Sequence, residues 1–187
     1  MNIILFGPPG AGKGTQAKYL VKKLNGFQIS TGDMLRDEIN NNTHIGKKII
    51  NIMNDGKFVS DDIVNQLIEK SVYDPIKKEK LIFDGYPRSL SQAKNLDLLL
   101  EKSKQKIGHI FFLNVNKETI IKRIEKRKVL EKRSDDDLQT ILKRYDTYME
   151  TTQPVLNFYS KKTNFHEIDG TLEIDEITRK IDTFINV

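Results

Sequence analysis

Short apolar runs recur along the chain, and amphipathic stretches separate them. The first run, at 2–6, is apolar at consecutive positions rather than alternating, which is typical of a strand buried on both faces of a parallel sheet. The predicted strands cover residues 2–6, 27–29, 81–83, 110–115 and 165–168. The alternation of strands and helices predicts an α/β fold with a doubly wound parallel sheet of about five strands, flanked by helices. In such a sheet, ligands bind outside the carboxyl ends of the strands.

One segment interrupts the alternation of strands and helices. Residues 30–59 are mostly helical in pattern and end in Asn54-Asp55-Gly56-Lys57, which is typical of a helix end followed by a turn. We interpret this segment as a small helical insertion at the edge of the sheet. The chain shows no internal repeat and no low-complexity linker, so its 187 residues are expected to form one domain.

The composition argues against a disulfide-linked, secreted or membrane-spanning protein. The chain has no cysteine, which excludes disulfides and thiolate metal sites. It enters the first predicted strand without a charged leader or cleavage site, and no apolar run approaches the twenty or so residues of a membrane span. We therefore expect a cytoplasmic protein with no membrane partner.

The net charge of +5 could indicate a nucleic-acid partner. Most of the lysines, however, alternate with acids, as in 77–80 and 122–126, which is typical of solvated helix faces. No recognition helix or interleaved aromatic patch accompanies the charge, so no nucleic-acid partner is expected.

The sequence GPPGAGKGT at 7–15 lies between the first predicted strand and a predicted helix. Glycines in this position let the backbone turn its N–H groups inward, and the helix start adds partial positive charge, so together they form an anion cradle. Lys13 adds a mobile full charge. The common phosphate-loop pattern places Ser or Thr directly after the lysine, whereas here Gly14 follows and Thr15 comes next. Mg²⁺ is therefore expected to be held mainly through water.

A second group of polar residues follows the predicted strand at 81–83. Asp84 lies at the tip of this strand beside the glycine loop, where a carboxylate can hold hydrated Mg²⁺. Gly85 permits close approach of a ligand. Arg88, held after the rigid Pro87, can donate two parallel hydrogen bonds to phosphate oxygens, which a lysine cannot.

Four parts of the sequence carry a family resemblance: GPPGAGKGTQ at 7–16, ISTGDMLR at 29–36, DGYPR at 84–88, and Gln92. In this order and spacing they resemble the nucleoside monophosphate kinases, and most closely the adenylate kinase family, nearly end to end. The resemblance implies a P-loop fold and reversible, Mg²⁺-dependent phosphoryl transfer, ATP + AMP = 2 ADP, serving adenine nucleotide homeostasis. The implied partners are ATP, AMP and ADP, bound by a monomer.

The resemblance also implies a role for each residue that matches the family. The expected ATP-binding residues are Gly10, Ala11, Gly12, Lys13, Gly14, Thr15, Arg123, Arg127 and Leu172. The expected AMP-binding residues are Thr31, Arg36, Lys57, Phe58, Val59, Gly85, Tyr86, Pro87, Arg88, Gln92, Arg133 and Arg144. The expected catalytic residues are Lys13, Arg88, Arg127, Arg133 and Arg144, and Asp84, Asp33 and Thr15 are expected to hold Mg²⁺ through water.

The arginines between residues 122 and 144 follow helical spacing. Arg123 and Arg127 are four apart and share a helix face. Arg133 and Arg144 are eleven apart, so they share a face if their helix is continuous.

The resemblance implies a core of 1–29, 60–125 and 137–187, a monophosphate-binding insertion at 30–59 and a lid at 126–136. Some bacterial relatives carry a longer lid with four zinc-binding cysteines, so this chain resembles the short-lid type and no zinc is expected. The turn at 169–172 resembles the loop whose backbone contacts the ATP base.

The expected chemistry needs positioning and positive charge more than covalent help. The phosphoryl-transfer transition state is loose and spreads charge over its equatorial oxygens. No general base is required, because an AMP phosphate oxygen is already anionic. The insertion and the lid are expected to close over the substrates and exclude water.

Three alternatives stay open at this point. A UMP/CMP kinase shares the phosphate-binding residues and a short lid, but typically carries Asn near Gln92 and Ala at Thr31. The Gln92 amide matches the N1 and N6 groups of adenine, unless it is a solvent-facing helix residue. A switch GTPase is disfavoured because 116–119 reads NKET, without the aspartate of the guanine-reading pattern. A nucleic-acid-binding protein would show steep salt dependence.

Overall fold

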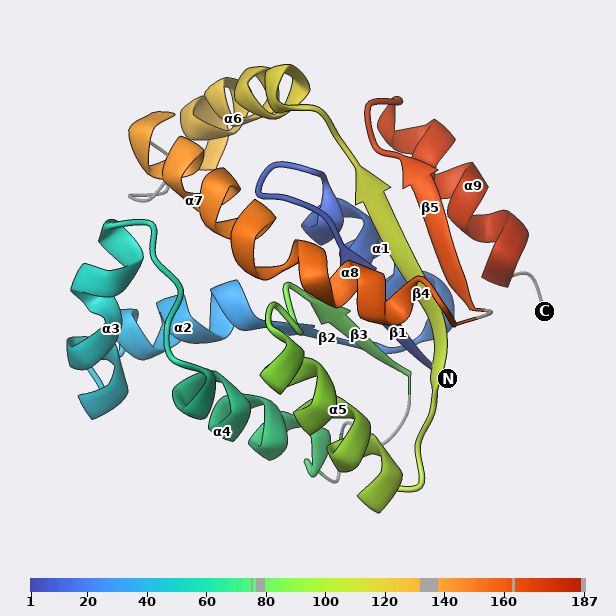
Figure 1. Cartoon of the computed structure of the whole chain (residues 1–187), viewed down its shortest axis with the longest axis horizontal. Helices are drawn as coiled ribbons and strands as arrows, with labels where there is room; N and C mark the ends of the chain where they lie inside the picture. The colour runs from blue at the N-terminus through green and yellow to red at the C-terminus, as the bar shows by residue number, and fades with distance from the viewer. Residues whose placement is uncertain (75, 77–79, 132–137, 163, 186–187) are drawn as a thin grey trace.

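The computed structural model describes residues 1–185 except 75, 77–79, 132–137 and 163, and the backbone but not the side chains of 126–131. Its described residues form a parallel sheet of five strands in the order β2-β3-β1-β4-β5 (Figure 1). The strands are β1 (Asn2–Phe6), β2 (Phe27–Ser30), β3 (Leu81–Asp84), β4 (Ile107–Asn114) and β5 (Phe165–Asp169). The predicted fold class and all five predicted strands are confirmed.

Helices cover both faces of the sheet. Successive residues of β1 point to opposite faces, so Ile4 and Phe6 join one apolar cluster with α4, α5 and α8, whereas Ile3 and Leu5 join another with α1 and α9. All five residues of β1 are buried, as a strand covered on both faces requires. The helices are α1 (Lys13–Leu24), α2 (Thr31–Asn40), α3 (His44–Asn54), α4 (Asp61–Val72), α5 (Leu90–Lys102), α6 (Lys117–Glu131), α7 (Leu138–Thr151), α8 (Gln153–Tyr159) and α9 (Ile174–Ile185).

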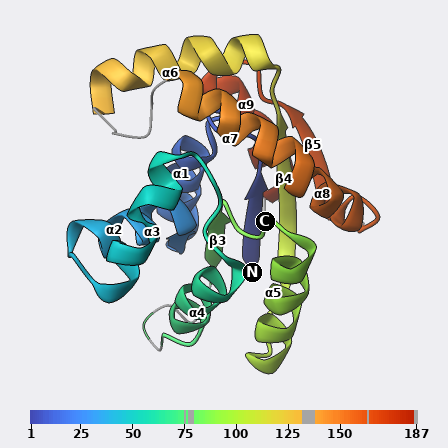
Figure 2. The ribbon, with the colours of Figure 1, turned by 60° about the vertical axis from the view of Figure 1, so that its left-hand side comes forward.

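The predicted helical insertion consists of α2 and α3, which project from the edge of the sheet after β2 (Figures 1 and 2). Ser30 caps α2 by accepting a hydrogen bond from Asp33 N, and Thr43 caps α3 by accepting one from Gly46 N. The two helices pack so closely that a Cβ on Gly46 would lie 2.0 Å from the Glu38 carbonyl oxygen. Only glycine therefore fits at this contact.

The helix α3 ends at Asn54, as the sequence predicts, and the turn that follows needs glycine because Gly56 has a φ of +74°. This turn lies against α7, since a Cβ on Gly56 would approach the Thr140 carbonyl oxygen to 2.9 Å. The helices α6 and α7 lie beyond the carboxyl ends of the strands (Figure 2). The insertion and α7 therefore meet over the edge of the sheet where ligands are expected.

The strand β4 begins at Ile107, earlier than predicted, because its first residues are only partly buried and include Gly108, which weakens the apolar pattern. None of the helices in the described ranges has the length and apolar character of a membrane span.

Candidate active site

The glycine loop connects β1 to α1, as predicted. Gly12 caps α1 in the left-handed region with a φ of 92°, and Gly10 has a φ of +81° and packs against Ile120 and Ile124 of α6. The Lys13 ammonium group donates to the carbonyl oxygens of Gly7 at 2.7 Å and Pro8 at 3.1 Å. The charge of Lys13 therefore lies on the loop that would wrap a phosphate chain.

Asp84 lies beside this loop, because β1 and β3 are neighbours and Leu5 is in register with Asp84. A Cβ on Gly14 would lie 3.5 Å from the Asp84 carboxylate, which shows how closely the loop and the acid approach. Gln28 Nε2 donates to the same carboxylate at 3.1 Å. No sequence pattern identifies Gln28, because its position next to Asp84 depends on the pairing of β2 with β3.

A hydrated Mg²⁺ fits these residues. Asp84 and Thr15 both line an open cleft along the loop. Asp33 also lines it but forms an ion pair of 2.5 Å with Arg36. Within the described ranges, no three His, Asp or Glu side chains are grouped so that they could ligate a metal directly. An ion at this place would therefore keep water in much of its coordination shell.

The cleft along the loop encloses about 1650 Å³ and is open to solvent. It is strongly basic, since Arg36, Arg88, Arg123 and Arg144 line it together with Lys13. Arg123 donates to the carbonyl oxygens of Ala11 at 3.4 Å and Leu172 at 3.0 Å. It therefore joins the glycine loop to the turn after β5, and brings three of the expected ATP-binding residues together.

A second cavity of about 520 Å³ lies between the sheet and the insertion. One part of its wall is basic, with Lys57, Arg88 and Arg144. The rest is mainly apolar, with Leu35, Met53, Val59 and Val64, together with the polar side chains of Thr31 and Gln92. Such a cavity can take a ligand with an anionic group at one end and a flat, weakly polar group at the other.

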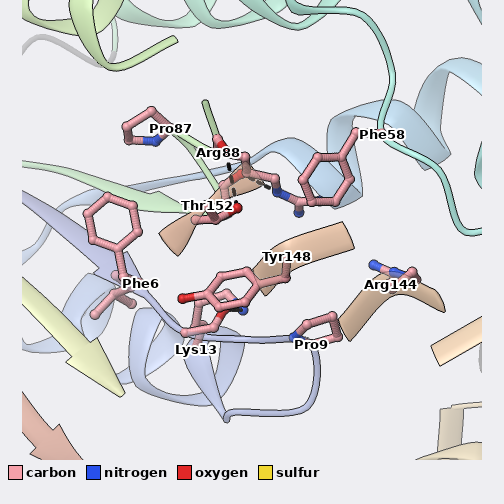
Figure 3. A pocket seen from close by; sticks show the side chains of 12 residues that line it. Phe6, Pro9, Lys13, Phe58, Pro87, Arg88, Arg144, Tyr148 and Thr152 are labelled. Carbon is pink, nitrogen blue, oxygen red and sulfur yellow. Dashed lines mark hydrogen bonds between the residues drawn. The ribbon is translucent and has the colours of Figure 1, made fainter. Parts of the chain in front are cut away.

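Arg88 and Arg144 line both the cleft and the cavity, and also a smaller cavity of about 390 Å³ between them. Arg88 Nε donates to the Gly85 carbonyl oxygen at 2.7 Å, and the Arg88 carbonyl oxygen accepts from the Thr152 hydroxyl at 3.1 Å. Figure 3 shows the Arg88 side chain beside the Phe58 ring, with Lys13 and Tyr148 nearby. Burial, with Arg144 nearby, lowers the pKa of Arg88 to about 10, so the side chain stays charged at neutral pH.

Gln92 is buried, with 4% of its surface exposed, which excludes the alternative of a solvent-facing helix residue. Its Oε1 accepts from Arg88 N at 2.7 Å, and its Nε2 donates to the Asp61 carboxylate at 2.7 Å. Thr31 is also buried, and its hydroxyl donates to the Gly85 carbonyl oxygen at 2.8 Å. Asp61 was missed by the sequence analysis, because an acid in the first turn of a helix is ordinarily explained by the helix dipole.

Three of the expected AMP-binding residues that the structure describes are absent from the wall of the second cavity. Arg36 lines the cleft along the glycine loop instead. The Tyr86 side chain is 1% exposed, donates to Asn65 Oδ1 at 2.8 Å and is absent from the cavity wall. Burial raises the pKa of Tyr86 to about 12. Pro87 lines the smaller cavity instead. Tyr86 and Pro87 hold the turn before Arg88 in place.

Two of the expected arginines cannot be placed. Arg133 lies outside the described residues, and only the backbone of Arg127, in α6, is described. Arg144 lies on α7, which begins at Leu138, so a face shared by Arg133 and Arg144 stays a prediction.

Tyr148 is a residue that the sequence analysis missed. It lines the smaller cavity with Lys13 and Arg88, is buried, and its hydroxyl has no hydrogen-bond partner among the described residues. Burial raises its pKa. A tyrosine four residues after Arg144 is one turn along the same helix, and that spacing is the one signal that could have identified it.

Comparison with known proteins finds the same family in a sequence model and in full-length relatives. The sequence model of the family described as adenylate kinase matches residues 5–164. The protein named adenylate kinase of Pelagibacter ubique (strain HTCC1062) is 49% identical over 100% of both chains. That of Mycoplasma capricolum subsp. capricolum is 42% identical over 97% of each. That of Caulobacter sp. (strain K31) is 39% identical over 100% of this chain and 99% of its own length.

Proposed function

The chain belongs to the adenylate kinase family, and from this premise we propose which of its residues perform the transfer of a phosphoryl group from ATP to AMP. The enzyme is an ATP:AMP phosphotransferase of the nucleoside monophosphate kinase class. Relatives named adenylate kinase cover the whole chain, and the UMP/CMP kinase alternative is not favoured.

The observation that carries the proposal is the position of Arg88 and Arg144, which line both the cleft along the glycine loop and the cavity under the insertion. A phosphoryl group that moves from one nucleotide to the other must pass where the two spaces meet. Two guanidinium groups at that junction can bind phosphate oxygens of both nucleotides.

ATP occupies the cleft in this proposal. Its phosphates bind the backbone N–H groups of the loop 10–15 and the Lys13 ammonium group. Arg123, fixed between Ala11 and Leu172, stacks on the adenine of ATP, and Arg127 binds its phosphates.

AMP occupies the cavity. Its phosphate lies at the basic wall near Arg88 and Arg144, and Arg36 of the adjoining cleft and Arg133 are proposed as further phosphate ligands. Its base lies between apolar side chains near Thr31 and Gln92, as the polarity of the two parts of the wall supports. The backbone of residues 57–59 and Gly85 encloses the nucleoside.

The chemistry follows from this arrangement of charges. An anionic AMP phosphate oxygen attacks the γ-phosphorus of ATP, the bond to the β,γ-bridging oxygen breaks, and ADP leaves from each side. Lys13, Arg88, Arg127, Arg133 and Arg144 stabilise the negative charge on the transferred group. Arg88 is preorganised for this role by its hydrogen bond to Gly85 and its contact with Phe58.

Asp84, helped by Asp33 and Thr15, would hold the water shell of a Mg²⁺ ion bound with ATP, which supplies positive charge to the phosphates. Zinc has no role in this proposal. Asp33 pairs with Arg36 through Oδ1 in the present structure, and its other carboxylate oxygen can accept a hydrogen bond from water of the ion.

We further propose that residues 30–59 act as the monophosphate-binding domain and 126–136 as a short lid, and that both close over the nucleotides to exclude water. The chain acts as a cytoplasmic monomer on free nucleotides, without a nucleic-acid or membrane partner.

One coupled assay tests the proposed function. The purified protein is supplied with ATP and Mg²⁺ plus AMP, CMP, UMP or GMP in separate reactions, and ADP formation is measured. AMP should be the best acceptor by a wide margin, and the reverse reaction from ADP should form ATP and AMP. Equal kcat/KM for CMP and AMP would restore the UMP/CMP kinase alternative.

A further inference from the structure

Asp61 connects α4 to α5 at the base end of the cavity. One of its carboxylate oxygens accepts a hydrogen bond from Gln92 Nε2 and the other accepts one from the Ser89 hydroxyl, each at 2.7 Å. Ser89 in turn caps α5 by accepting from Gln92 N at 3.1 Å. Both ends of the Asp61 carboxylate are therefore fixed by residues of α5.

These contacts determine which way the Gln92 amide points. An ionised carboxylate only accepts hydrogen bonds, whereas the Arg88 backbone N–H only donates. If the amide were rotated by half a turn, Oε1 would face the Asp61 carboxylate and Nε2 would face the N–H of Arg88. The two acceptors would then face each other, as would the two donors. The hydrogen bonds of Gln92 to Asp61 and Arg88 would both be lost in a buried place.

The Gln92 amide keeps part of its hydrogen-bonding capacity for a ligand. A glutamine amide carries two N–H donors and two oxygen lone pairs, and the contacts to Asp61 and Arg88 use one of each. One donor and one acceptor remain, in a fixed order, on a side chain that lines the cavity.

We propose that Asp61 is a positioning residue that gives the enzyme its preference for a 6-aminopurine over a 6-oxopurine monophosphate. This rests on the proposed function, in which the base of AMP lies near Gln92. With the orientation set by Asp61, the remaining N–H pairs with the unprotonated N1 of adenine, and the remaining lone pair accepts from its 6-amino group. A 6-oxopurine carries a proton on N1 and an oxygen acceptor at position 6. Its N1–H would face the remaining N–H of Gln92, and its 6-oxygen would face the remaining lone pair, so neither hydrogen bond could form.

The test compares AMP with inosine monophosphate, which has the same sugar and phosphate but a 6-oxopurine base. Initial rates are measured with saturating ATP and Mg²⁺ for the unmutated enzyme, Asp61→Asn and Asp61→Ala. The matched control is Asp62→Asn, because Asp62 is the next residue of the same first helical turn but is exposed. It removes the same charge from the start of α4 without touching Gln92.

Asn at position 61 can donate as well as accept, and Ala does neither, so position 61 no longer opposes the rotated Gln92 amide in either variant. Only the Arg88 N–H then still favours the native orientation. The ratio of kcat/KM for AMP to that for inosine monophosphate should fall at least 5-fold in both Asp61 variants, through a higher KM for AMP. The ratio in Asp62→Asn should stay within 2-fold of the unmutated value, as should the KM for ATP in all variants. Because phosphate contacts are common to both acceptors, a general effect of charge or folding would leave the ratio unchanged.

A second readout needs no nucleotide. The Gln92 side-chain amide signals in a ¹H–¹⁵N spectrum should be shifted by the hydrogen bond to the carboxylate and should move toward ordinary glutamine values in Asp61→Asn, but not in Asp62→Asn. If both Asp61 variants are folded and keep the AMP preference of the unmutated enzyme, the proposed role of Asp61 is wrong. If the unmutated enzyme itself fails to phosphorylate AMP, the proposed function fails instead, and the two results are distinguishable in the same experiment.

Discussion

The guanidinium group of Arg88 lies over the ring of Phe58, with 4.9 Å between the Arg88 Cζ atom and the ring centroid. Phe58 belongs to the segment that follows the insertion, whereas Arg88 follows β3, so this contact joins two separate parts of the chain at the basic wall of the cavity. An aromatic face stabilises a cation that has lost part of its contact with water. The contact therefore helps to keep a charged side chain in place before any nucleotide binds.

Loss of the positive charge of either Lys13 or Arg88 should abolish most of the activity. Lys13→Ala and Arg88→Ala should each lower kcat by about 10²-fold or more, because each removes a preorganised charge from the transferred phosphoryl group. Thermal unfolding should show that both variants are folded. Arg179→Ala, which removes an exposed arginine of α9, is the control and should keep normal kcat. A folded Arg88→Ala enzyme with near-normal kcat would contradict the proposed catalytic role.

Removal of the Gln92 side-chain amide should reduce base discrimination. Gln92→Ala should lower the preference for AMP over CMP, UMP and GMP from about 10²-fold toward 10-fold or less, because the adenine groups lose their partners. Steady-state kinetics with each acceptor measure the preference. The KM for ATP should change little, and an equal loss of kcat/KM for all four acceptors would instead indicate a purely structural role.

Activity should depend on Mg²⁺, and the apparent affinity for Mg²⁺ should fall when Asp84 is changed. In Asp84→Asn, the Mg²⁺ concentration for half-maximal rate should rise about 10-fold, because a neutral amide holds the hydrated ion less well. Titration of Mg²⁺ at fixed ATP measures the effect.

Elemental analysis after dialysis should find no stoichiometric zinc in the unmutated protein, since the chain has no cysteine. Retained zinc would overturn the short-lid assignment.

Gly46→Ala should destabilise the fold by about 1–3 kcal/mol, a range typical of overpacking. Its Cβ would lie 2.0 Å from the Glu38 carbonyl oxygen, so α2 and α3 would have to move apart. Urea unfolding measures the change in free energy. Lys47→Ala, at the next and exposed position of α3, is the matched control and should change stability by less than 0.5 kcal/mol.

Acid should destabilise the protein through a pair of histidines on neighbouring strands. His109 Nδ1 and His166 Nε2 lie 3.2 Å apart, and His166 stacks on Phe184 with 4.0 Å between ring centroids. Burial, followed by the charge of His166, lowers the pKa of His109, and burial lowers that of His166. Since the ordinary value is 6.5, the unfolded chain takes up protons first as the pH falls. The stabilisation is therefore present above pH 6.5 and is lost as the pH falls below it.

The pH effect is measured as the free energy of unfolding at pH 7.5 and pH 5.5. The unmutated protein should lose more stability over this interval than the double variant His109→Phe with His166→Phe. His44→Gln removes the exposed histidine at the start of α3 and should leave the loss as it is in the unmutated protein. Equal losses in the double variant and the unmutated protein would show that the pair does not contribute.

The order of elements could be predicted because the sheet is parallel and covered on both faces. Residues 3–6 and 81–83 consist of buried apolar side chains, so their sequence carries the strand signal directly. The beginning of β4 could not be predicted, since Gly108 and His109 lie where the sheet is only partly covered. The partly buried β2 and β5 are still predicted from their apolar residues, so the strand signal fails where glycine and a polar residue interrupt the apolar run.

The residues of the candidate site divide in a similar way. Lys13 and Arg88 belong to compact motifs, and the turn that contains each motif also fixes its side chain. Asp61 and Gln28 contact site residues only because folding brings them together, as with the Asp84 carboxylate for Gln28. Tyr148 lines the smaller cavity only because folding places α7 there. Their residue types are common on helices and strands, so sequence spacing alone could not select them.

The contact between Gly56 and Thr140 joins the segment proposed to hold AMP to the helix that carries Arg144. A nucleotide that shifts one of these two parts changes the free energy of the other. The affinities for the two substrates are then thermodynamically linked, and the factor by which ATP changes the affinity for AMP equals the factor by which AMP changes that for ATP. We therefore expect the binding of the two nucleotides to be coupled where the turn after α3 meets α7, without any separate regulatory domain.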